Sequence, residues 1–286
     1  MHQASHLEEN HAVSEAPGYP AARHEFMLRR LHSLAGLVPI GAFLVFHLAT
    51  NAGIVLDKNG NFYQQQVNLI HSLGPLLIPV EFIFIFIPLA FHAGLGVKMW
   101  LQGAPNTSHY PYWGNVRFML QRITGVVALL FILVHLWQMH WMANRLPGGG
   151  LFDAEQAPGT TAWILQHYAA WAGPVYFVGI LCAVFHLANG VWTSLITWGI
   201  TIGPAAQRKA GYVCAVLGVA LALAGTSSLW GFMRFGKPVE PKKVHEQQLS
   251  GFRVQGSAVG QRDGETEGRG DTETRGGNWA KRNVGR

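Results

Sequence analysis

Four histidines lie inside strongly apolar stretches of the chain, where a polar ring is unfavourable to bury. They are the centres of VFHLATNAG at 45–53, AFHAGLGV at 90–97, LVHLWQMH at 133–140 and AVFHLANGVW at 183–192, that is His47, His92, His135 and His186. One such histidine is adequately explained as a core residue bonded to a backbone carbonyl. Four on separate segments favour a function, because ionisable side chains within a membrane face the bundle interior and mark functional sites.

The segments that carry these histidines are long enough to cross a bilayer. Only 13% of the 286 residues are charged and 49% are hydrophobic, about half the usual charged share. Four stretches without Lys, Arg, Asp or Glu reach the roughly 20 residues that a spanning helix needs, and a fifth carries one acid, Glu81. The sequence predicts an all-α integral membrane protein with transmembrane helices at roughly 31–55, 75–101, 118–143, 165–199 and 209–233, the first four forming the functional bundle.

The polar ends of the chain define the expected domain organisation. We expect a polar N-terminal extension at 1–28, a five-helix transmembrane domain at 29–235 and a C-terminal tail at 236–286, with both polar termini disordered. The tail is rich in Gly, Arg, Glu and Thr, a composition that cannot bury apolar surface and is typical of disorder.

Charges at the helix ends predict the orientation. One side has Arg23, Arg29, Arg30, Lys98, Arg117, Arg122, Arg208 and Lys209, and the other has Lys58, Arg145, Arg234 and Lys237. The positive-inside rule therefore places the N-terminus in the cytoplasm and the C-terminus outside. The same clustering explains the net charge of +6 without a nucleic-acid partner.

The depths of the four histidines divide them into two pairs. His47 and His135 each lie ten residues before the first outer charge, about 15 Å inside that boundary. His92 and His186 fall in the inner half. Two facing pairs at separate depths are what two non-covalent b-type haems with a histidine on each face require, and such haems transfer single electrons. We expect the second ring nitrogen of each histidine to bond a carbonyl of its own helix.

Other interpretations of the histidines remain open at this point. A zinc site needs its ligands at one depth, whereas these four histidines lie at two depths, two at each. A proton relay needs acidic residues between the histidines, and Glu81 is the only candidate. A transporter with a histidine-lined pathway is a further alternative. Glycines near each histidine would let a flat macrocycle approach, although close helix packing also favours them. The sequence has no CxxCH motif, which excludes covalent c-type haem.

Longer motifs carry a resemblance to a known family. They are RRLHSLAGLVPIGAFLVFHL at 29–48, FIFIPLAFHAGLGV at 84–97, LQRITGVVALLFILVHLW at 120–137 and FHLANGVWTSLITWGITIGPAAQR at 185–208. Over about residues 25–233 the chain resembles the single-chain, five-helix, two-haem cytochrome b membrane anchor of succinate dehydrogenases and fumarate reductases.

The resemblance implies specific ligands and partners. His47 and His135 match the ligands of the outer haem b iron, and His92 and His186 match those of the inner one. A FAD-containing flavoprotein and an iron–sulfur subunit would dock on the cytoplasmic side of the bacterial cytoplasmic membrane. This chain would have no succinate site and would pass electrons to menaquinone, an exchangeable substrate.

Two alternatives within this resemblance stay open. Fumarate reductases of this type that oxidise menaquinol carry a glutamate two residues before the fourth ligand. Here that position is Val184, which favours succinate oxidation. The cytochrome b subunit of another quinone-linked dehydrogenase is the remaining alternative.

Further polar residues are candidates for contacts to haem propionates, quinone or the partner subunits. They are Arg29, Arg30, His32, Ser33, Gln121 and Arg122, with anchoring on the positive side as the alternative for each arginine. His32 lies fifteen residues before His47, over 20 Å inward along the helix, too far to serve the outer pair. Glu81 is expected in the outer half, where it could relay protons to quinone. His140 is either a contact of the outer site or a solvated residue.

Overall fold

Five long apolar helices dominate the computed structural model, which describes residues 19–103, 109 and 111–241. The helices that are long and apolar enough to span a membrane are Arg23–Leu56, Gly74–Gln102, Trp113–Met139, Ala169–Thr197 and Pro204–Arg234. The described residues contain no strand, so the all-α, five-span prediction is confirmed. The disorder expected over 236–286 is wrong for 236–241, where Gln166 Nε2 donates to the carbonyl of Gly236 at 2.8 Å and the Val239 N–H donates to the carbonyl of Gly159 at 3.0 Å. Residues 242–286, and residues 1–18 of the N-terminal extension, lie outside the described part, so disorder there stays a prediction.

The first two spans each contain a π-helical segment. The first runs through α1 (Tyr19–Ala35), η1 (Gly36–Gly41) and α2 (Ala42–Leu56), with Pro39 inside η1. The second runs through η2 (Gly74–Leu76), α4 (Leu77–Glu81), η3 (Phe82–Phe86) and α5 (Ile87–Gln102), with Pro88 in the first turn of α5. Proline has no N–H to donate to the preceding turn, which explains why the helix next to it adopts the wider π-helical hydrogen-bond pattern. Such π-bulges are frequent at functional sites.

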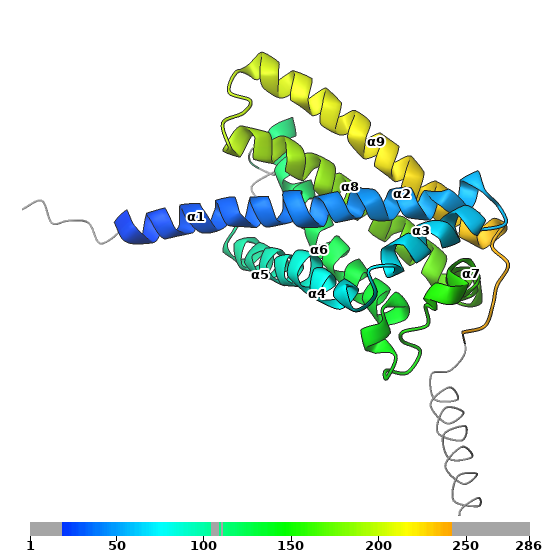
Figure 1. Cartoon of the computed structure of the whole chain (residues 1–286). Coiled ribbons are helices and arrows are strands. Elements are labelled where there is room, and N and C mark those ends of the chain that lie inside the picture. Colours follow the sequence, from blue (N-terminus) through cyan, green and yellow to red (C-terminus); the bar gives the residue numbers. More distant parts are fainter. Residues whose placement is uncertain (1–18, 104–108, 110, 242–286) are drawn as a thin grey trace, which may run out of the picture. The chain divides into compact units, whose positions relative to one another are not determined.

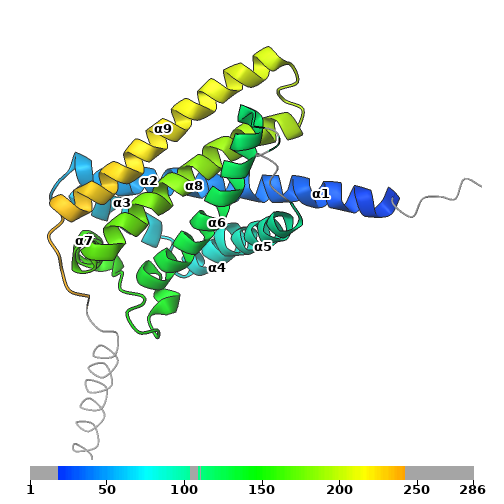
Figure 2. The same cartoon turned by 180° about the vertical axis from the view of Figure 1, so that it is seen from behind.

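The other three spans are single helices (Figures 1 and 2). They are α6 (Trp113–Met139), α8 (Ala169–Thr197) and α9 (Pro204–Arg234). α8 packs against both α6 and α9, and α9 also packs against α2. The histidine-bearing α2, α5, α6 and α8 therefore belong to one bundle, and α9 covers one of its sides.

Two short helices, which the sequence did not predict, lie between spans. They are α3 (Asn61–His71) and α7 (Ala157–His167). Tyr63 of α3 packs edge-on against Phe232 of α9, with ring centroids 5.0 Å apart, and belongs to a core with Ile54 and Leu165. Burial raises the pKa of the Tyr63 hydroxyl to about 12. α3 and α7 thus pack with the ends of α2 and α9 in a buried hydrophobic core.

Several helix boundaries differ from the predicted ones. α1 begins at Tyr19, inside the extension expected at 1–28. The fourth span was predicted as one helix from 165, but Tyr168, with φ −101° and ψ 24°, separates α7 from α8. α9 begins earlier than expected because Pro204 occupies its first turn, where the missing N–H costs nothing.

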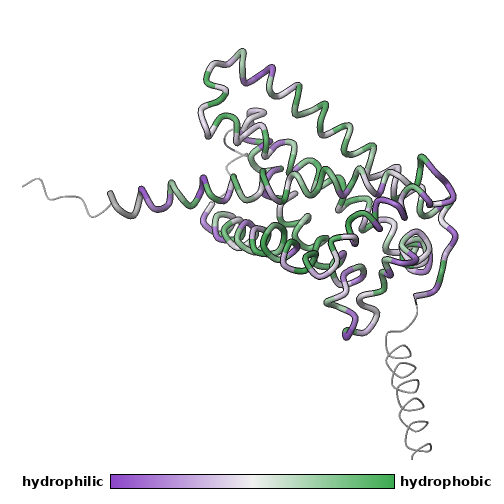
Figure 3. The backbone as a smooth tube through the Cα atoms, in the orientation of Figure 1, coloured by the Kyte–Doolittle hydropathy of each residue, from purple (hydrophilic) through white to green (hydrophobic). Residues whose placement is uncertain are grey.

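The spans consist mainly of hydrophobic residues (Figure 3), and many of their large apolar side chains are exposed. Phe46 is 73% exposed, Leu130 59% and Val216 70%. Exposed apolar side chains of this size occur on all five spans, which matches contact with lipid, because lipid tails are themselves apolar. The chain is a multi-pass membrane protein.

Candidate functional site

The four histidines form two facing pairs. His47 of α2 and His135 of α6 have ring centroids 5.7 Å apart at 74°, and His92 of α5 and His186 of α8 have centroids 6.0 Å apart at 86°. A metal–nitrogen bond is about 2.0–2.1 Å, and the ring centre lies about 1 Å further out. Two imidazoles on one metal therefore have centres about 6 Å apart, close to both observed spacings.

The hydrogen bonds of the inner pair fix which ring nitrogen is free. His92 Nδ1 lies 2.9 Å from the carbonyl oxygen of His32, and His186 Nδ1 lies 3.0 Å from that of Gln121. Carbonyl oxygens only accept hydrogen bonds, so Nδ1 carries the hydrogen in both rings and the Nε2 lone pair is available to a metal.

The expectation that each ring bonds a carbonyl of its own helix is wrong for both residues. The acceptors belong to the neighbouring helices α1 and α6. A ring that faces the bundle interior points away from the carbonyls of its own helix, which already accept backbone N–H groups.

Hydrogen bonds through the Tyr176 hydroxyl orient His135 of the outer pair. Tyr176 donates to Gln138 Oε1 at 3.1 Å, and His135 Nδ1 lies 3.4 Å from the same hydroxyl. Since the single phenolic hydrogen is used toward Gln138, the hydroxyl accepts from His135 Nδ1. His135 thus presents Nε2, as His92 and His186 do.

Two glycines leave room beside the inner rings. A Cβ added at Gly125 would lie 2.8 Å from Cε1 of His186, and one at Gly36 would overlap the ring of His92. Any other residue at either position would push the imidazole aside. Glycine is required there by close approach rather than by backbone conformation.

Glu81, the acid expected in the outer half of the membrane, lies next to His140. Glu81 Oε2, at the end of α4, lies 3.6 Å from Nε2 of His140, which follows α6. Phe86 packs edge-on against His140 with centroids 5.1 Å apart. Burial lowers the pKa of His140, and the Glu81 carboxylate opposes that shift.

Three of the predicted inner-end residues meet near the inner pair. His32 stacks on His92, with centroids 3.9 Å apart and planes 9° apart. Ser33 bonds Ser194 at 2.8 Å. Arg30 donates to the carbonyl of Thr197 at 3.4 Å. Together they join α1 to α5 and α8.

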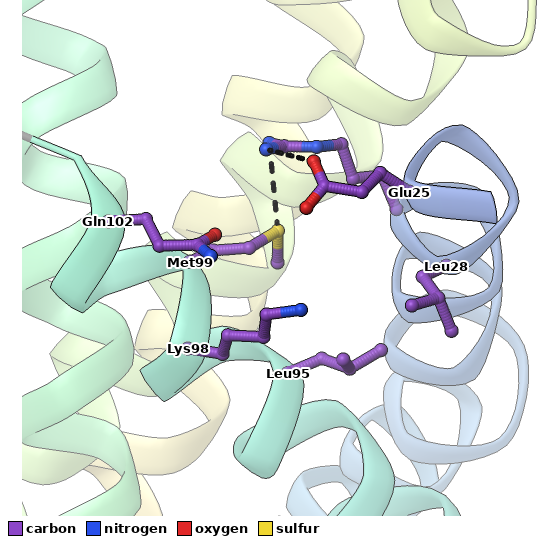
Figure 4. A pocket seen from close by; sticks show the side chains of 7 residues that line it. Glu25, Leu28, Leu95, Lys98, Met99 and Gln102 are labelled. Carbon is purple, nitrogen blue, oxygen red and sulfur yellow. Dashed lines mark hydrogen bonds and ion pairs between the residues drawn. The ribbon is translucent and has the colours of Figure 1, made fainter. Parts of the chain in front are cut away.

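The two remaining predicted arginines contact other groups. Arg29 lies 3.9 Å from Glu25 and 3.9 Å from Met99 Sδ, lining a small pocket between α1 and α5 (Figure 4). Arg122 donates to the carbonyls of Trp100 and Gly103 at the C-terminal end of α5, where a cation stabilises the helix terminus.

Comparison with known proteins decides the family. No family model matches the chain. Over 213 residues, 74% of this chain and 100% of the relative, it is 34% identical to the succinate dehydrogenase cytochrome b558 subunit of Bacillus subtilis (strain 168). The chain belongs to the succinate dehydrogenase cytochrome b subunit family. The predicted resemblance to the cytochrome b membrane anchor of a succinate dehydrogenase is thereby confirmed.

The name of the relative implies a haem, and the paired histidines of this chain fit such a group. The described residues contain no group of three or more His, Cys, Asp or Glu able to hold a metal ion. A haem needs no such group, because its porphyrin supplies the equatorial nitrogens and asks for one side chain on each face. The two facing imidazole pairs, with Nε2 free in His92, His186 and His135, are the donors that this geometry offers.

Proposed function

We propose that this chain is the membrane-anchor subunit of a succinate dehydrogenase and carries electrons from an iron–sulfur subunit to menaquinone. His47 with His135 would hold an outer haem b, and His92 with His186 an inner one. Each haem, when bound, would supply one-electron transfer. The observation that carries the proposal is the two ring pairs at 5.7 and 6.0 Å, on four different helices of a membrane bundle.

The chain's own residues would bind and orient these groups. His32, Gln121 and Tyr176 accept the Nδ1 hydrogens of His92, His186 and His135, which leaves Nε2 of these three rings free to bind iron. Gly36 and Gly125 keep the space beside the inner rings. The apolar walls of the helices would exclude water.

The cytoplasmic end would receive the flavoprotein and iron–sulfur subunits. The excess of Lys and Arg lies at that end of the helices, which the positive-inside rule assigns to the cytoplasm. Arg30, His32 and Ser33 cluster there beside the inner pair. The chain contains no succinate site in this proposal, and the partner subunits carry that chemistry.

Glu81 would hold and deliver protons for quinone reduction. Each quinone takes up two protons with two electrons, so the site needs a proton donor. The Glu81 carboxyl is joined to His140 across 3.6 Å, at the end of the bundle expected to face outward. A proton can therefore pass between two partly buried groups without crossing lipid.

Val184 favours succinate oxidation over the fumarate-reductase alternative. Its side chain is 3% exposed and packs with Leu48 and Leu221. A carboxylate at this position would be unpaired in apolar surroundings, which is strongly unfavourable. The menaquinol-oxidising type of fumarate reductase carries a glutamate at the corresponding place.

The test is purification of the chain with its co-expressed subunits, followed by succinate addition. We expect a flavoprotein and an iron–sulfur protein to co-purify, succinate to reduce b-type absorption, and a menaquinone analogue to reoxidise it. A colourless preparation would favour the transporter alternative. Co-purification of a hydrogenase or formate dehydrogenase subunit instead would contradict the succinate assignment.

A further inference from the structure

A continuous polar chain runs from a cation to one inner histidine. Arg117 of α6 donates to Asn189 Oδ1 through Nε at 2.9 Å and Nη2 at 2.6 Å. Asn189 Nδ2 donates to Gln121 Oε1 at 2.8 Å. Gln121 Nε2 donates to the carbonyl of His186 at 3.0 Å, and the carbonyl of Gln121 accepts from His186 Nδ1 at 3.0 Å.

Helical spacing brings these residues together. Arg117 and Gln121 are four apart on α6, and His186 and Asn189 are three apart on α8, so each pair shares a helix face. Asn189 is 5% exposed, and both ends of its amide are bonded. Two N–H groups of one guanidinium on a single oxygen form a charge-assisted contact, stronger than a neutral hydrogen bond.

The cation at the start of the chain is itself fixed. The Arg117 guanidinium lies over the Trp192 ring, 3.8 Å from its centroid. Trp192 Nε1 donates to the carbonyl of Gln207 in the first turn of α9 at 2.8 Å. Asn189 and Trp192 of α8 therefore hold the Arg117 guanidinium, and α9 fixes Trp192 in turn, which is more than anchoring at a membrane surface requires.

We propose that Arg117 and Asn189 are positioning residues for the inner histidine pair. They hold Gln121 so that the His186 ring keeps one orientation toward His92, and the Arg117 charge favours the reduced form of the iron bound there. The proposal rests on the assignment of His186 as an axial ligand. Both residues act on His186 through Gln121.

The outer pair provides an internal comparison. His135 is oriented by Tyr176 and Gln138, which are neutral. Perturbing Arg117 should therefore change the inner site and leave the outer one as it was. A general loss of folding would change both.

The experiment uses the purified complex and the variants Arg117→Gln, Arg117→Lys and Asn189→Leu. Thr226→Val is the matched control, since its hydroxyl bonds the carbonyl of Ala222 within α9 at 2.7 Å. Haem content, redox titration of each haem and the paramagnetic resonance of the oxidised haems are recorded. The last two report the local charge and the relative orientation of the axial rings.

We expect Arg117→Gln to lower the reduced-to-oxidised ratio of the inner haem about tenfold at a fixed potential, which is about 59 mV for one electron. Asn189→Leu should shift the inner resonance, and Arg117→Lys should shift that resonance while keeping the potential close to wild type. The outer haem and the Thr226→Val complex should be unchanged.

Two results would overturn the proposal. One is an inner haem whose potential and resonance are unchanged in both Arg117→Gln and Asn189→Leu. The other is an equal shift of both haems. If the Asn189→Leu complex does not assemble, the Arg117→Lys complex provides the test instead. An unaltered paramagnetic resonance of the inner haem in Arg117→Lys would contradict the role of the guanidinium group. A wild-type complex without two b haems refutes the proposed function instead, so the two failures are distinguishable.

Discussion

Replacing Gly125 by alanine should weaken haem binding at the inner site selectively. The new methyl would lie 2.8 Å from Cε1 and 3.1 Å from Nδ1 of His186, closer than carbon atoms tolerate. The ring must then move, which strains the 3.0 Å bond from Nδ1 to the Gln121 carbonyl. Overpacking of this kind costs about 1–3 kcal/mol, which weakens binding at the inner site about 5- to 150-fold.

Gly94→Ala is the matched control for this prediction. Gly94 lies two residues after His92, and a Cβ there meets nothing within 4 Å. Both substitutions gain the same helix propensity, about 1 kcal/mol, so only the contact with His186 differs. The assay is haem per polypeptide in the purified complex, with redox titration to separate the two sites. Full inner occupancy in Gly125→Ala with an unshifted potential would refute the reasoning.

Three other predictions follow from the site. Glu81→Gln should slow quinone reduction about 10²- to 10⁴-fold, the usual contribution of a general acid, and leave both haem spectra intact; an unchanged rate rejects the proton role. Tyr176→Phe should lower the free energy of unfolding by about 1–3 kcal/mol, because Gln138 Oε1 is left buried without its donor. It should also shift the redox potential of the outer haem alone. Thermal unfolding and redox titration measure these two effects, and a shift of the inner haem alone would contradict the assignment. In a background without native cysteines, an impermeant thiol reagent should label Lys58→Cys from outside intact cells but not Arg208→Cys; the reverse pattern contradicts the orientation.

The spans and the pairing of the histidines were predictable because both depend on distance along a helix. An apolar stretch of spanning length needs no knowledge of its neighbours. Residue count multiplied by the helical rise gave the depths of His47 and His135, and these two rings do face each other. The ligand roles themselves remain predictions.

The hydrogen bonds around the rings were not predictable from one sequence. They depend on how each helix is rotated about its axis, which brought His92 to the carbonyl of His32 rather than to one of its own helix. From the sequence, Arg117 is recognisable only as a positive charge at a helix end. Its spacing of four from Gln121 was the available signal, but nothing in the sequence placed Asn189 opposite.

Local features of the backbone were also not predictable from the sequence. α3 is short and polar enough to be taken for a loop, and its burial depends on Phe232, far along the chain. The apolar stretch across Tyr168 gave no sign of the break between α7 and α8. The π-segment η1 could have been suspected from Pro39, although proline alone does not distinguish a bulge from a kink.

The most direct test of the central claim is haem per polypeptide in the purified complex, for wild type and for alanine at each of the four histidines. The account predicts two b haems in wild type. His47→Ala and His135→Ala should each lose the same haem, and His92→Ala and His186→Ala the other. A single haem per wild-type chain, or different haems lost from His47→Ala and His135→Ala, would contradict it.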